Sequence, residues 1–160
     1  MLTEIVFFGI DEMKQLPPCA GTVVVSILDQ SEASQRPSLA GFRDVLAMQF
    51  EDTYEELKLA KPGDWPDEPS DAQHDRYRQG KGERVPALSD ARRIVDFLKQ
   101  HHDSREPLKL VVHCYGGISR SAAVASWAAV RFFVPLNTSR STDRANSRLL
   151  RLMDKADNRR

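Results

Sequence analysis

Four short apolar runs alternate with longer stretches of mixed polarity along the chain. They cover residues 5–8, 22–28, 45–50 and 108–112, and the run at 45–50 alternates larger apolar side chains with Ala47 and Gln49. Short apolar runs with few interruptions are typical of buried strands. We therefore expect four strands with both faces covered, as in a parallel sheet.

The intervals between these runs carry the spacing of helices. Residues 86–101 repeat apolar side chains at helical spacing, and Pro86 is suited to a first turn. Residues 121–133 are apolar nearly all round, as expected of a helix buried among other elements. A last helix is expected to start near residues 141–143, where Asp143 suits the positive helix end. Its apolar side chains are Leu149, Leu150, Leu152 and Met153.

Alternating strands and helices predict an α/β fold with a central, mostly parallel sheet of four to five strands and helices on both faces. The 160 residues are about one ordinary domain long, so a single domain over 1–160 is expected. Residues 61–84 do not fit the alternation, because they are polar and rich in Pro, Gly and charge. We interpret them as a loop insertion, and loops of that length tend to be functional lids or mobile insertions.

Charge and composition exclude several classes of partner. Acidic and basic residues balance at 23 each, so nothing indicates nucleic acid or a membrane surface as partner. No run approaches the roughly 18 apolar residues of a membrane span. The first apolar stretch lies between Glu4 and Asp11 and lacks the basic start of a signal peptide. The two cysteines, Cys19 and Cys114, lie far apart in sequence, which favours a reducing, cytoplasmic setting.

The sequence HCYGGISRS, residues 113–121, follows the last apolar run directly. Ligands bind beyond the carboxyl ends of parallel strands, and Cys114 lies at such an end. Gly116 and Gly117 permit a backbone that points successive N–H groups inward, and the helix that follows adds its positive end. Arg120 suits paired contacts to two oxygens of a phosphate. Residues 115–119 are therefore expected to bind the phosphate: Tyr115, Gly116, Gly117, Ile118 and Ser119.

The same donors would favour a thiolate at Cys114, which could attack phosphorus and form a cysteinyl-phosphate. The hydroxyl of Ser121 is placed to hydrogen-bond the sulfur when it leaves, and His113 is expected to orient the loop. The alternative interpretation is purely structural: this stretch is a tight turn that needs a small residue. The full set of His, Cys, two Gly, Arg and a hydroxyl in register favours the reactive loop. No histidine has a ligand spacing with a cysteine or carboxylate cluster, so no metal is expected.

On these residues the chain resembles the cysteine-dependent protein tyrosine phosphatases, and Cys114 to Ala122 is similar to the small bacterial dual-specificity-like members. The resemblance is specific over about residues 108–130 and weaker elsewhere. It implies a parallel-centred α/β fold, phosphomonoester hydrolysis without metal or cofactor, and an aspartate general acid on a mobile loop.

Two aspartates compete for the role of general acid, which must protonate the leaving oxygen. Asp52 follows the third predicted strand, where the small bacterial members carry an aspartate, although it could simply cap a short helix at 53–59. Asp67 lies in Trp65-Pro66-Asp67, the loop tripeptide of the larger enzymes, but further from the cysteine than is usual there. We favour Asp52 and keep Asp67 as the alternative.

Residues 115–119 carry no charge, which suits a singly phosphorylated group better than a highly anionic inositol phosphate. Phosphotyrosine in a protein or peptide, with tolerance of phosphoserine or phosphothreonine, is the expected substrate. A phospho-binding module without turnover is a second hypothesis, and a sulfur-transfer enzyme of the rhodanese kind fits the loop poorly. Arg144 and Asn146 either approach the phosphate pocket or form a polar helix start.

Overall fold

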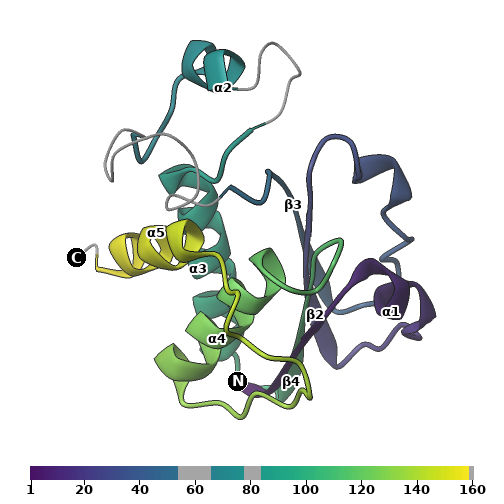
Figure 1. Ribbon diagram of the computed structural model, residues 1–160. Coiled ribbons are helices and arrows are strands. Elements are labelled where there is room, and N and C mark those ends of the chain that lie inside the picture. The colour runs from purple at the N-terminus through teal and green to yellow at the C-terminus, as the bar shows by residue number, and fades with distance from the viewer. Residues whose placement is uncertain (54–65, 78–83, 159–160) are drawn as a thin grey trace.

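One sheet of four parallel strands organises the computed structural model, which describes residues 1–53, 66–77 and 84–158 (Figure 1). The strands are β1 (Leu2–Phe8), β2 (Thr22–Leu28), β3 (Asp44–Gln49) and β4 (Leu108–His113). Their order is β1-β4-β2-β3, so β4 pairs with β1 on one side and β2 on the other. The four predicted strands and the α/β class are confirmed, and the sheet is wholly parallel.

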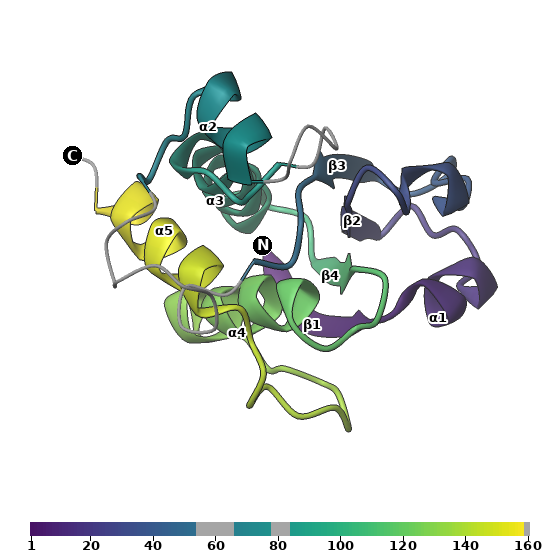
Figure 2. The same ribbon diagram turned by 45° about the horizontal axis from the view of Figure 1, so that its top comes forward.

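Successive side chains of the strands point to opposite faces of the sheet, so each face carries its own apolar cluster. In β2, Val23, Val25 and Ile27 belong to the main core, whereas Val24 packs with Met13 in a smaller cluster. The main core is closed by α3 (Leu88–His102), α4 (Arg120–Phe132) and α5 (Ser147–Asp157). The smaller cluster includes Met13 from α1 (Ile10–Gln15), a helix not predicted from the sequence. Helices therefore lie on both faces of the sheet (Figures 1 and 2).

Two predicted helix starts are wrong, and in both cases a capping side chain explains the shift. α3 begins at Leu88 rather than Pro86, because the Asp90 carboxylate accepts the Ala87 N–H at 2.9 Å. α5 begins at Ser147 rather than near 141–143, because the Asn146 side chain accepts the Leu149 N–H at 2.9 Å. Asp143 therefore lies before the helix and does not occupy its positive end.

The insertion predicted at 61–84 is not wholly loop. Its described part contains α2 (Asp71–Tyr77), and residues 61–65 and 78–83 lie outside the described residues. The short helix expected at 53–59 also lies outside them, apart from Thr53. The fully buried Arg148 connects α5 with the insertion and with the residues that follow it, since it donates to Pro66 O at 2.9 Å and to Pro86 O at 2.8 Å. Across the described ranges, no helix has both the length and the apolar character needed to cross a membrane.

Candidate active site

Cys114 lies directly after β4, a strand with neighbours on both sides, at the carboxyl edge of the sheet. Its side chain is buried, with 2% of the residue exposed. The Gly117 N–H donates to the sulfur at 3.2 Å, and Ser121 Oγ lies 3.1 Å from it. Because α4 starts at Arg120, the loop 114–119 curls back over the sulfur before the helix begins. The Cys114 sulfur therefore lies within hydrogen-bonding distance of one loop N–H and one hydroxyl.

Of the two adjacent glycines, only Gly117 has a backbone that demands glycine. Its φ is +66°, and a Cβ there would lie 2.3 Å from Gly9 N and 2.4 Å from Phe8 C. Gly116 has no positive φ, and a Cβ there would meet nothing closer than Ile118 Cδ1 at 3.6 Å. The sequence indicated both positions equally, but the turn requires one.

The loop is supported from outside by segments distant in the sequence. The Ile10 N–H at the start of α1 donates to Tyr115 O at 3.0 Å. Arg140, from the segment between α4 and α5, donates through Nη1 to Gly116 O at 3.3 Å and Gly117 O at 3.0 Å, and it also pairs with Glu12. These contacts hold three carbonyl oxygens of the loop in fixed directions. Sequence analysis missed Arg140 because it lies in an irregular stretch without a motif.

Arg120 is nearly buried, with 5% of the residue exposed. Its Nη1 donates both to Glu32 Oε1 and to Phe50 O, each at 3.1 Å. Burial opposes its charge, but the Cys114 sulfur and the Glu32 carboxylate outweigh burial and raise the pKa of Arg120. Both contacts use Nη1. Nε and Nη2 form the edge of the guanidinium that can donate to two oxygens of an anion, and neither contact occupies that edge. Nε has no hydrogen-bond partner among the residues that the structure describes.

Glu32 was not among the predicted site residues. It lies between β2 and β3, and its own N–H is held by the Asp29 carboxylate at 2.9 Å. The sequence offers no signal for it, since its partner Arg120 follows 88 residues later. Its ion pair with Arg120 fixes one side of the guanidinium and leaves the other side available.

His113 is fully buried, and its Nδ1 lies 3.2 Å from Cys114 O. Burial, helped by the charges of Arg36 and Arg120, lowers the pKa of His113 to about 4, although the contact with Cys114 O opposes the shift. Its Nε2 has no partner within the described ranges. His113 is therefore a neutral side chain at neutral pH that contacts the loop backbone.

The two candidate aspartates lie in different surroundings. Asp52 Oδ1 accepts the Ser119 hydroxyl at 2.5 Å and the Asn146 side-chain N–H at 2.8 Å, so Asp52 touches the loop. Asp67 instead pairs with Arg151, at 2.9 Å, and with Lys155. The bond from Lys155, together with Arg151, lowers the pKa of Asp67 despite partial burial. No described hydrogen bond or ion pair joins Asp67 to residues 113–121.

Asn146 connects the loop, the Asp52 segment and α5. It is fully buried, its main-chain N–H donates to Ser119 O at 3.1 Å, and its side chain donates to Asp52 and to Thr53 O at 3.0 Å. Its side-chain oxygen caps α5 by accepting the Leu149 N–H. Asn146 is thus the polar start of α5, and it also contacts Ser119 of the loop.

The rim of the loop is apolar and accessible, with Tyr115 42% and Ile118 47% exposed. In the described ranges, no three His, Cys, Asp or Glu side chains gather in a way that could hold a metal ion. The arrangement brings a buried thiol, a buried guanidinium and a carboxylate to one loop. Comparison of the chain with protein-family models, with curated proteins and with solved structures found no match.

Proposed function

We propose that the chain hydrolyses phosphomonoesters through a cysteinyl-phosphate intermediate, in a fold of the cysteine-dependent tyrosine phosphatase kind. Its proposed substrates are proteins or peptides that carry phosphotyrosine, and phosphoserine or phosphothreonine would be accepted in its place. One observation carries the proposal. Arg120 is buried, with Nη1 hydrogen-bonded and Nε without a partner in the described residues. The Cys114 sulfur is also buried, and a loop N–H contacts it. A dianionic tetrahedral group would satisfy both.

The proposed reaction has two steps. The Cys114 thiolate attacks phosphorus, the bond from phosphorus to the ester oxygen breaks, and Asp52 gives its proton to the leaving oxygen. Water then attacks phosphorus, Asp52 takes a proton from it, and the bond from sulfur to phosphorus breaks. Ser121, 3.1 Å from the sulfur, stabilises the returning thiolate. Because the thiol must stay reduced, a reducing setting such as the cytoplasm suits this chemistry.

The rim supports an aryl ester as substrate. Tyr115 and Ile118 are exposed beside the loop and provide apolar surface for an aromatic ring. None of residues 115–119 is charged, so the loop offers no further cation for a second phosphate.

The proposal can be tested by measuring the release of phosphate from an aryl phosphate. Wild type is compared with Cys114→Ser and Arg120→Lys. Wild type should turn over with EDTA present, Cys114→Ser should bind phosphate without turnover, and Arg120→Lys should lose the paired contact and bind weakly. Rapid acid quenching should trap phosphate on Cys114. If wild type releases no phosphate from any aryl ester and Cys114→Ser binds none, the proposal is wrong.

A phospho-binding module without turnover is the second candidate. Asp52 favours it in one respect, because its Oδ1 is already engaged by Ser119 and Asn146. Such a module would bind phosphopeptides with wild-type Cys114 and release no phosphate, so the same assay separates the two candidates.

A further inference from the structure

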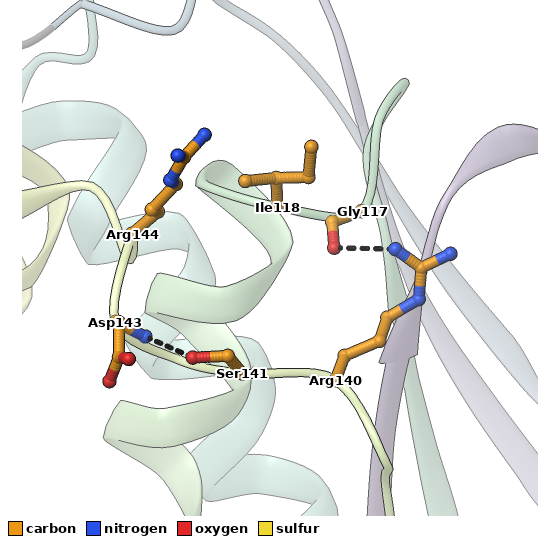
Figure 3. Close-up of a pocket in the computed structure, with 6 residues that line it drawn as sticks. All are labelled: Gly117, Ile118, Arg140, Ser141, Asp143 and Arg144. Carbon is orange, nitrogen blue, oxygen red and sulfur yellow. Dashed lines mark hydrogen bonds between the residues drawn. The ribbon is translucent and has the colours of Figure 1, made fainter.

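A hollow of about 310 Å³ lies beside the loop, between Ile118 and the segment 140–144 (Figure 3). It is lined by Gly117, Ile118, Arg140, Ser141, Asp143 and Arg144. Gly117 belongs to both places, since its N–H contacts the Cys114 sulfur and its carbonyl accepts from Arg140. Gly117 is therefore the residue between the hollow and the Cys114 sulfur, and Ile118 lies both at the rim of the loop and in the wall of the hollow.

Two guanidinium groups flank this hollow. Arg140 lies on one side and is held by the loop carbonyls and Glu12. Arg144 lies on the other side and is exposed, and its side chain has no hydrogen bond or ion pair with any residue in the described ranges. Figure 3 shows the Asp143 carboxylate directed away from Ile118 and Arg144. The cation of Arg144 is thus available to an anionic ligand.

We propose that this hollow is a substrate subsite for a carboxylate side chain close in sequence to the phosphorylated residue. The inference rests on the proposed function, because it requires a phosphopeptide in the loop. An extended peptide spans about 3.4 Å per residue, so a residue one to three positions away can reach past Ile118. Arg144 would bind the glutamate or aspartate, and Ser141 and Ile118 would contact its stem.

Binding to the Cys114→Ser protein tests the subsite independently of turnover. One probe is a phosphotyrosine peptide with glutamate at the two positions on each side, and its twin has glutamine there. The glutamate peptide should bind about fivefold more tightly, and Arg144→Ala should reduce that ratio to near one. Because the ratio is taken within one variant, a general loss of phosphate binding cancels.

Arg105→Ala is the matched control, since Arg105 is also exposed and precedes β4, at the opposite edge of the sheet. It removes the same charge and should keep the fivefold ratio. The subsite is wrong if the Cys114→Ser protein binds the glutamate and glutamine peptides equally. It is also wrong if Arg144→Ala leaves the ratio of the two affinities unchanged, or if Arg105→Ala lowers that ratio as much as Arg144→Ala does. Failure of the proposed function is separate, because it would appear as absent phosphate release by wild type.

Discussion

The side chain of Asn146 donates to Asp52 Oδ1 at 2.8 Å, although 94 residues separate the two in the sequence. The same oxygen accepts the hydroxyl of Ser119, whose carbonyl receives the main-chain N–H of Asn146. Asn146 therefore fixes the Asp52 carboxylate relative to the loop 114–119. We regard it as a positioning residue for the proposed acid.

Replacement of Asn146 separates its two roles. Asn146→Ala loses the cap of α5 and the contact with Asp52, so it should cost about 1 kcal/mol of stability and lower kcat about tenfold. Asn146→Ser keeps a capping oxygen but lacks both side-chain N–H donors. It should restore most of the stability and none of the kcat, as measured by urea denaturation and aryl phosphate hydrolysis. Full activity in Asn146→Ser would contradict the positioning role.

The choice between the aspartates can be decided by pH profiles. Asp52→Asn should lower kcat by about 10² to 10⁴ and abolish the fall in activity on the basic side, because the general acid is gone. Asp67→Asn removes ion pairs with Arg151 and Lys155 on α5 and should change stability by less than about 1 kcal/mol. Its pH profile should match wild type. A basic limb that survives in both variants would exclude both residues.

The adjacent glycines should respond differently to alanine. Gly117→Ala combines a positive φ with a Cβ 2.3 Å from Gly9 N, so it should cost about 2 to 3 kcal/mol and reduce activity about a hundredfold. Gly116→Ala serves as control, since its Cβ would have ordinary contacts only. It should remain near wild type in denaturation midpoint and kcat/KM. Equal losses in both would show that the loop needs flexibility rather than one conformation.

His113 should contribute a loss of stability in acid that Asp90 partly offsets. The pKa of His113 is lowered to about 4 in the folded protein. Between pH 6.5 and 4, His113 is therefore protonated in the unfolded chain but neutral in the folded protein. The stability contribution is complete above pH 6.5, and about 3 kcal/mol is lost as the pH falls to 4. His113→Asn should remove this loss, measured as the free energy of unfolding at pH 7 and 5. A parallel pH dependence in the variant would refute the assignment.

Asp90 should act in the opposite direction. Burial, against the bond from Ala87 N–H, raises its pKa to about 6. The folded protein therefore binds the proton more readily than the unfolded chain, and stability rises as the pH falls from 6 towards 4. Asp90→Asn, which keeps an acceptor for Ala87, should gain at most about 3 kcal/mol at pH 8 and about half of that at pH 5. In wild type the effects of His113 and Asp90 should largely cancel, so the free energy of unfolding should change little with pH. Each single variant should show the pH dependence that the remaining group causes.

The sequence by itself determined the strands, the α/β class and the local geometry around Cys114. Apolar runs indicate burial directly, and residues 113–121 are contiguous, so the order of strand, loop and helix start places Cys114 and Arg120 at the two ends of one short loop. It did not determine the starts of α3 and α5, because Asp90 and Asn146 cap them at positions that apolar spacing does not mark.

Only the tertiary structure decided which residues surround that loop. Asp52, Glu32, Asn146 and Arg140 come from four separate segments, and their contacts depend on how β3, α1 and α5 pack around the sheet. The same packing directs Asp67 to Arg151 and Lys155 on α5. A tripeptide motif carries no information about such long-range pairing, because the partners of a carboxylate are set by the folded chain around it.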